Sequence, residues 1–180
     1  GKINAVGTPD KPIVMTSEKE EPGAWGGIHI CGRAHTNAEG GKGSSEIGGA
    51  VYGGNDDADN SGTLQYIRLE YTGFAFDEEH EANGISFYSV GNGTIVDHCQ
   101  AYKGSDDGFE FFGGSVNVSN LVAVSCSDDS FDWTEGWNGK GTDLVAYQEA
   151  KATLGYDCDC LIEADNNEND NAATPVSHPI

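Results

Sequence analysis

The segment TIVDHCQAYKGSDDGFEFFGG, residues 94–114, and the segment VNVSNLVAVSCSDDSFDWTEG, residues 116–136, carry the same pattern twice. A shift of 22 residues superimposes their apolar and acidic positions: Val96 on Val118, Ala101 on Ala123, Asp106-Asp107 on Asp128-Asp129, Phe109 on Phe131 and Phe111 on Trp133. An internal repeat of this length is typical of stacked units, each of which covers the open side of its neighbour. The repeat therefore predicts a solenoid.

Two further copies extend the repeat in both directions. Residues 62–73, GTLQYIRLEYTG, match residues 93–104, GTIVDHCQAYKG, at a shift of 31, and residues 143–148, DLVAYQ, match residues 120–125, NLVAVS, at a shift of 23. The larger shift includes an insertion, residues 74–83, after which residues 84–87 resume the phase of residues 108–111. Insertions on a fixed repeat are what a solenoid tolerates.

Each unit contains two short β-branched or aromatic strands separated by a turn rich in Gly and Asp. A unit of this length has no room for a strand pair and a crossover helix, and the leucine-rich-repeat signature is absent. We predict an all-β fold, a right-handed parallel β-helix with about 22–25 residues per coil and insertions. Residues 1–180 are expected to form one domain of a longer chain.

The charge of the chain restricts its partners. Nine Lys and Arg residues against 30 Asp and Glu residues give a formal net charge of −21. Such a polyanion is expected to repel nucleic acids and anionic membrane surfaces, while metal cations, cationic groups and neutral glycans remain as ligands. The five Cys residues contain no CxxC pair, and an odd number gives little basis for a disulfide framework.

The repeated acidic pairs are the first candidate site. Asp106 and Asp107 share their repeat phase with Asp128 and Asp129, which predicts carboxylates about 4.8 Å apart on adjacent coils. Carboxylates this close repel unless they are protonated, turned into solvent or bridged by a cation. These four residues are therefore candidate calcium ligands or paired catalytic carboxylates. The alternative is a solvated turn, in which each Asp bonds its own backbone.

A second calcium candidate precedes the third copy of the repeat. The segment DADNSG, residues 57–62, offers oxygen ligands from Asp57, Asp59 and Ser61 with a Gly at the sixth position. The twelfth position is Arg68 instead of a bidentate Glu, so the segment is not an EF-hand. A calcium ion at this loop would need a further carboxylate from elsewhere in the chain.

Two tryptophans beside carboxylates indicate a glycan site. Sugars stack on indole faces while acids accept hydrogen bonds from hydroxyl groups, so Trp137, Glu135 and Asp132 are candidate ligand-binding residues. Trp133 shares its phase with Phe111 and is predicted to be in the core, whereas Trp137 lies beyond the strand and is predicted to be exposed. The insertion at residues 74–83 could form a lip beside a groove. The alternative there is a solvated charged loop.

Evidence for catalysis is sparse, and no catalytic residue is predicted. The Ser-Asp-Asp-Gly segment at residues 105–108 resembles the Asp-Asp of pectin-degrading hydrolases, but their Gly-His-Gly and Arg-Ile-Lys segments are absent. Lyases of this shape need an Arg or Lys base, and Arg68 is expected to pair with Glu70 instead. No His lies in a nucleophile context. A calcium-dependent polysaccharide lyase or glycoside hydrolase of the β-helix type is the alternative to a binding protein.

Four segments resemble one family of β-helix proteins: WGGIHICGRA (25–34), YGGNDDADNSGTLQYIRLEYTGFAF (52–76), GSDDGFEFFGG (104–114) and IEADNNENDNAATP (162–175). The family consists of Bacteroidetes surface or outer-membrane lipoproteins without assigned function. The resemblance implies an extracytoplasmic location at the cell surface or outer membrane, with a lipid anchor outside this segment and other surface proteins as partners. On this basis we expect a non-enzymatic binding or scaffold module, an accessory subunit of a nutrient uptake complex for glycans or peptides.

Overall fold

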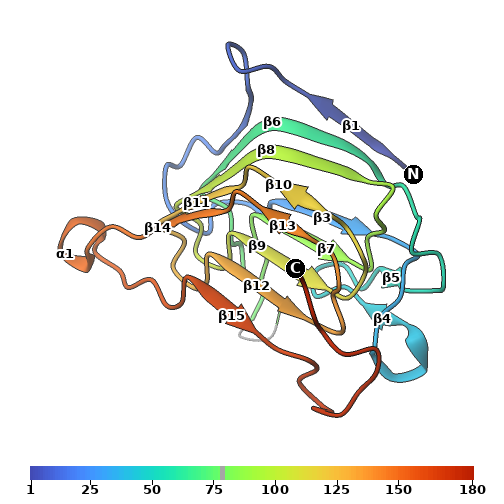
Figure 1. Cartoon of the computed structure of the whole chain (residues 1–180). Coiled ribbons are helices and arrows are strands. Elements are labelled where there is room, and N and C mark those ends of the chain that lie inside the picture. The colour runs from blue at the N-terminus through green and yellow to red at the C-terminus, as the bar shows by residue number, and fades with distance from the viewer. Residues whose placement is uncertain (78–79) are drawn as a thin grey trace.

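The computed structural model describes residues 1–77 and 80–180 and forms a right-handed parallel β-helix, as the repeat predicts (Figure 1). The first sheet has the order β1 (Ile3–Val6), β6 (Gly62–Glu70), β8 (Ile95–Tyr102), β10 (Val118–Ser119) and β13 (Gly141–Thr142). Three more strands extend it: β2 (Ile13–Met15) pairs with β6, while β11 (Val122–Val124) pairs with β8 and with β14 (Val145–Tyr147). The strand pairs of this sheet are parallel.

The second parallel sheet forms the opposite wall of the solenoid (Figure 1). Its order is β3 (Ile28–Cys31), β7 (Ile85–Tyr88), β9 (Phe109–Phe112), β12 (Phe131–Thr134) and β15 (Ile162–Ala164). A small antiparallel hairpin of β4 (Gly43–Ser44) and β5 (Val51–Tyr52) follows β3, preceded by the 3₁₀ helix η1 (Glu39–Gly41). The remaining helix is α1 (Lys151–Leu154). Within the described residues, no helix has the length and apolar character needed to cross a membrane.

Strand registers confirm most of the repeat and correct one part of it. Val96 faces Val118, Ala101 faces Ala123, and Phe109 faces Phe131, at the predicted shift of 22. In the copy at residues 62–73, however, Leu64 faces Val96, so the shift is 32 and the prediction of 31 is wrong. The reason is that the two Gly-Thr pairs are not equivalent. Thr94 lies in the turn before β8, where its hydroxyl accepts a hydrogen bond from the Ser61 amide.

The coils bend at repeated positions with left-handed backbone. One corner is formed by Tyr66, His98, Asn120 and Asp143, with φ angles of 52°, 51°, 53° and 55°. A second corner is formed by Tyr71, Lys103 and Ser125, with φ angles of 63°, 53° and 52°. Left-handed backbone is unfavourable for residues other than Gly, so its recurrence on successive coils marks a bend that the stacking imposes.

Aromatic rings stack along the inside of the second sheet. Phe87 stacks on Phe111 with centroids 4.9 Å apart, and Phe111 stacks on Trp137 at 4.1 Å. Trp137 is only 2% exposed and donates its indole N–H to the Val116 carbonyl. The prediction that Trp137 is exposed is therefore wrong, because the chain turns back into the solenoid after β12. Trp133 pairs with Phe111, as its repeat phase predicts, and is partly buried against the core.

The outward face of the second sheet has a different character. Because side chains alternate along a strand, the residues between the inward aromatic positions point outward. Strand pairing places four of them in one row across the coils: Ser86, Glu110, Asp132 and Glu163. A second row contains Tyr88 and Phe112, whose rings stack at 4.4 Å. Tyr52, from the β4–β5 hairpin, packs on Tyr88 at 5.0 Å.

Candidate cation-binding cleft

Two adjoining cavities on this outward face make up what we call the acidic cleft. The smaller has a volume of about 180 Å³, and the eight described residues that line it are all acidic: Glu46, Glu81, Asp106, Asp107, Glu110, Asp128, Asp132 and Glu163. The larger, of about 630 Å³, shares Glu46, Glu110 and Asp132 and adds Glu39, Glu135, Asp165, Glu168 and Asp170. No Lys, Arg or His is among the described residues that line either cavity.

The repeated turns supply one group of carboxylates. The carboxylate of Asp107 accepts a hydrogen bond from the Asp129 amide at 2.9 Å, and that of Asp129 accepts one from the Cys160 amide at 2.7 Å. The predicted stacking on adjacent coils is thus confirmed. Asp106, Asp107 and Asp129 are 8%, 6% and 2% exposed, so a solvated turn is the wrong description for these three residues. Asp128 alone is exposed.

The strands supply a second group. Asp107, Glu110 and Asp132 each offer one oxygen, and these oxygens lie within 4.8 Å of one another. Asp106, Asp107 and Asp128 form another such group, so Asp107 belongs to both. The Asn83 amide donates to Glu110 Oε2 at 2.6 Å, whereas Asp132 Oδ1 is buried without a hydrogen-bond partner among residues 1–77 and 80–180.

The electrostatics of the acidic cleft follow from burial of carboxylates with little opposing charge, since His80 acts on Glu46 but no basic residue is among the described lining residues. Burial raises the pKa of Asp106 to about 8 and that of Glu46 to about 7, and neighbouring carboxylates add to both shifts. Burial likewise raises the pKa of Asp132 to about 6 and holds the pKa values of Asp107 and Glu110 well above the ordinary range. Near neutral pH the cleft therefore retains protons unless a cation neutralises it.

The donor set of the acidic cleft fits a hard divalent cation. Calcium takes six to eight oxygen ligands at about 2.3–2.6 Å, which allows two ligand oxygens to be up to about 5.2 Å apart. The oxygens around Asp107 meet this limit. Asp132 Oδ1, which has no hydrogen-bond partner in the described part of the chain, is a ligand atom of the kind such an ion requires. Asp107, Glu110 and Asp132 would hold the ion, with Asp106 and Asp128 next to them.

The predicted calcium loop has protein partners instead. Arg33 Nε donates to Asp59 Oδ1 at 3.1 Å, and Ser61 Oγ donates to Asp59 Oδ2 at 3.0 Å. Asp57 Oδ1 accepts hydrogen bonds from the backbone and the ring of His35. None of these residues lines the acidic cleft. A calcium role for Asp57, Asp59 and Ser61 stays a prediction, and we do not include these residues in the cleft.

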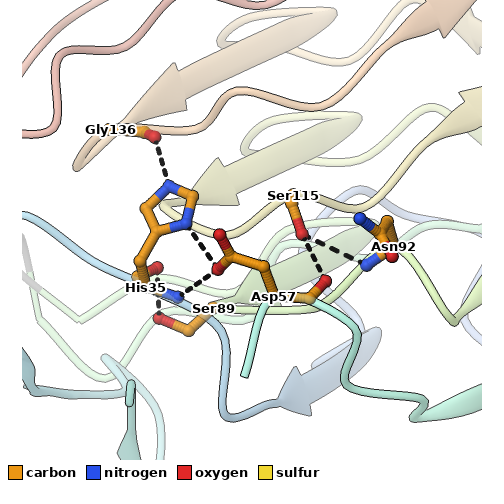
Figure 2. Close-up of polar contacts among 6 residues, drawn as sticks. All are labelled: His35, Asp57, Ser89, Asn92, Ser115 and Gly136. Atoms are coloured by element: carbon orange, nitrogen blue, oxygen red, sulfur yellow. Dashed lines mark hydrogen bonds and ion pairs between the residues drawn. The ribbon is translucent and has the colours of Figure 1, made fainter. Parts of the chain in front are cut away.

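Figure 2 shows the His35–Asp57 pair with two serines beside it. The contacts of these residues are structural. His35 Nδ1 lies 2.7 Å from Asp57 Oδ1, and Nε2 lies 2.8 Å from the Gly136 carbonyl. The hydroxyls of Ser89 and Ser115 donate to the backbone carbonyls of His35 and Asp57. Neither serine contacts the imidazole, so the residues form no nucleophile–base pair.

The three residues predicted to bind a glycan are separated. Asp132 and Glu135 line the larger cavity, where Glu135 accepts hydrogen bonds from Tyr52 and Thr36. Trp137 lies on the other side of the sheet, in the core. Trp133 and Trp137 also border a separate, mainly apolar cavity of about 520 Å³ near the C-terminal coil. A ligand role for Trp137 stays a prediction.

Sequence reasoning missed Glu46, Glu81, Glu110 and Glu163. The superposition of Glu110 on Asp132 at the shift of 22 is a signal that could have identified the strand carboxylates. Glu81 comes from the insertion predicted as a lip, and it lines the smaller cavity. Residues 78 and 79 of that insertion, both Glu, lie outside the described residues.

Comparison with known proteins agrees with the architecture. Residues 1–180 match the sequence model of a family described as a pectate-lyase-like beta helix domain. Neither the curated proteins nor the solved structures contain a match to the chain.

Proposed function

This chain belongs to the family of pectate-lyase-like β-helix domains, and we propose that it is a non-enzymatic binding module whose acidic cleft takes divalent cations, calcium above all. The observation that carries the proposal is a cluster of carboxylates, two of them the buried Asp106 and Asp107, with no basic side chain among the described lining residues. A bound calcium ion would supply the missing positive charge and open coordination positions for oxygen atoms of a ligand.

The preference for a hard cation follows from the ligand atoms. Among the described lining residues of the smaller cavity, carboxylate oxygens are the only charged atoms that could ligate a metal ion. Ligand sets made only of oxygen suit calcium and magnesium better than zinc or copper. Magnesium demands near-ideal octahedral geometry and retains its water, whereas calcium accepts irregular sets. The two overlapping groups around Asp107 form such an irregular set.

Calorimetric titration of chelator-treated protein with Ca²⁺ at pH 7.5 tests the proposal. We expect saturable binding that Asp107→Asn weakens at least tenfold, because Asp107 is shared by both groups. The amide oxygen of Asn can still accept the hydrogen bond from the Asp129 backbone, so the fold is retained. The matched control is Asp143→Asn, which removes an exposed carboxylate outside the cleft and leaves binding unchanged. Absence of saturable binding to the unaltered chain would overturn the proposal.

The proposed setting is the cell surface or outer membrane, where the module would bind a glycan or a peptide within an uptake complex. Support comes from the resemblance to surface lipoproteins and from the net charge of −21, which disfavours nucleic acid as a partner. Digestion of intact cells with protease tests the location. Degradation of the chain while a periplasmic marker survives would support it, and protection until the cells are lysed would contradict it.

Glycan hydrolysis is the second candidate function. Glu110 and Asp132 face the same cleft, and burial raises both pKa values, that of Asp132 only to about 6. One protonated and one ionised carboxyl group is the arrangement that acid–base hydrolysis requires. A lyase is less well supported, because no Lys or Arg is among the described lining residues. Turnover of a polysaccharide in the presence of chelator, abolished by Glu110→Gln, would favour the hydrolase over the binding module.

A further inference from the structure

Residues 42–52, which contain the β4–β5 hairpin, are flanked on each side by a pair of glycines. Gly40 and Gly41 have φ angles of 72° and 68°, and Gly53 and Gly54 have φ angles of 101° and 159°. All four adopt backbone that other residues resist, and glycines at the two ends of a segment can act as hinges. At Gly53 a Cβ atom would lie 2.6 Å from the Gly41 carbonyl oxygen, so the observed position of the hairpin requires glycine there.

The hairpin brings Glu46 to the acidic cleft. Glu46 lines both cavities and accepts a hydrogen bond from the Tyr88 hydroxyl at 3.4 Å. The other carboxylates of the smaller cavity belong to the coils or to the insertion at residues 74–83. Glu46 is therefore the single carboxylate of this cavity whose place depends on the hairpin.

Few contacts hold the hairpin against the solenoid. Tyr52 packs on Tyr88, and its hydroxyl donates to the Glu135 carboxylate at 3.0 Å. Only Tyr52 and Ser45 are buried among residues 42–52, and residues 48–51 are exposed. A segment with so little buried surface can open at low cost in free energy.

We propose that residues 42–52 form a flap that closes over the acidic cleft when a divalent cation binds, with Glu46 as an additional ligand and Tyr52 as the latch. This inference rests on the proposed cation-binding function. Without a cation, Glu46 faces Glu81 and Asp132, with His80 as a nearby group of opposite charge. Once these carboxylates are ionised, above about pH 7, repulsion between the like charges favours an open flap. A cation among these groups reverses the sign of the interaction, so that closure and binding stabilise each other.

Hydrogen exchange measured by mass spectrometry tests the flap. Peptides covering residues 42–52 of the full chain are followed in chelator and in saturating Ca²⁺, and the α1 peptide is the surface control. We expect exchange in the flap to slow at least fivefold with Ca²⁺ while α1 is unchanged. Glu46→Gln should abolish this protection and weaken Ca²⁺ binding only partly. Asp143→Asn is the control, because Asp143 is exposed and lies outside the cleft, so that the protection should be unchanged. Gly53→Ala should likewise reduce the protection, since it obstructs the closed position.

Calorimetry on the same samples separates the two proposals. Calcium binding together with flap protection that depends on Glu46 supports both. Calcium binding without any change in flap exchange, or with protection that survives Glu46→Gln, overturns the flap and leaves the cation site intact. Absence of calcium binding overturns the proposed function and the flap with it.

Discussion

The loop at residues 57–61 and the acidic cleft are both rich in carboxylates, but their surroundings differ. In the loop, Arg33 and His35 supply donors to Asp59 and Asp57. In the cleft, carboxylates face mainly one another. Burial alone would raise the pKa of Asp57, but the hydrogen bonds from His35 lower it, whereas burial raises the pKa of Asp132. Whether a carboxylate stabilises the fold at neutral pH therefore depends on its hydrogen-bond donors and not on how many acidic residues surround it.

The pH dependence of stability should show the largest difference between the two regions. Asp106, Glu46 and Asp132 have folded-state pKa values of about 8, 7 and 6, above the ordinary values near 4. Their favourable contribution is complete below about pH 4 and is lost as pH rises through 6 to 8. We expect the free energy of unfolding of chelator-treated protein to fall by several kcal/mol between pH 5 and 8.5, because a pKa difference of one corresponds to about 1.4 kcal/mol.

Urea denaturation at each pH measures this loss, and calcium provides the control. Saturating Ca²⁺ should restore stability mainly above pH 6, because the ion replaces the protons. The lowered pKa of Asp57 acts in the opposite direction, and its contribution is lost only as pH falls below about 4. A stability profile that is flat from pH 5 to 8.5 in chelator would show that the cleft carboxylates are adequately solvated.

Removing the charge of Asp57 should destabilise the protein. Asp57→Asn keeps an acceptor oxygen but replaces the charge-assisted hydrogen bonds to His35 with neutral ones, at a cost of about 1 kcal/mol at pH 7.5. The loss should be the same in chelator and in Ca²⁺. A destabilisation that appears only in Ca²⁺ would instead make the loop a metal site.

The same substitution in the cleft should have the opposite sign. Asp132→Asn removes a buried carboxylate from its like-charged neighbours, so we expect the chelator-treated protein to gain about 1 kcal/mol at pH 7.5. In saturating Ca²⁺ the gain should disappear, because a ligand has been lost. The urea midpoints of Asp57→Asn and Asp132→Asn, measured side by side, compare the two regions directly. Destabilisation by Asp132→Asn in chelator would contradict the claim that neighbouring carboxylates repel Asp132.

The repeat made the stacked part of the molecule predictable. Matching Val96 to Val118 and Phe109 to Phe131 gave the strand pairing, because in a parallel β-helix equivalent positions of adjacent coils lie side by side. The same logic placed Asp107 beside Asp129. It fails for residues 62–73, because the inward apolar positions set the register and matching the two Gly-Thr pairs displaces these positions by one residue.

Other parts of the candidate site could not be predicted because they depend on insertions. Glu46 and Glu81 belong to segments without a repeat partner, so no sequence phase places them over the cleft. Arg33 and His35, which contact the carboxylates of the calcium-like segment, are likewise distant from that segment in the sequence. Trp137 follows the strand by three residues, yet packing on Phe111 draws it into the core.

The exposed carboxylate of the repeated turns should have the smallest effect. Asp128 shares a ligand group with Asp106 and Asp107 but lies in solvent. Exposed charges contribute about 0.2–1 kcal/mol, so Asp128→Asn should leave stability unchanged within about 0.5 kcal/mol and weaken Ca²⁺ binding by roughly two- to fivefold. Calorimetric titration of Asp128→Asn and Asp132→Asn with Ca²⁺ shows which group contributes more to Ca²⁺ affinity, the one containing Asp128 or the one containing Asp132. A larger loss of affinity from Asp128→Asn than from Asp132→Asn would place the ion at the turns, and the buried strand carboxylates would then need another explanation.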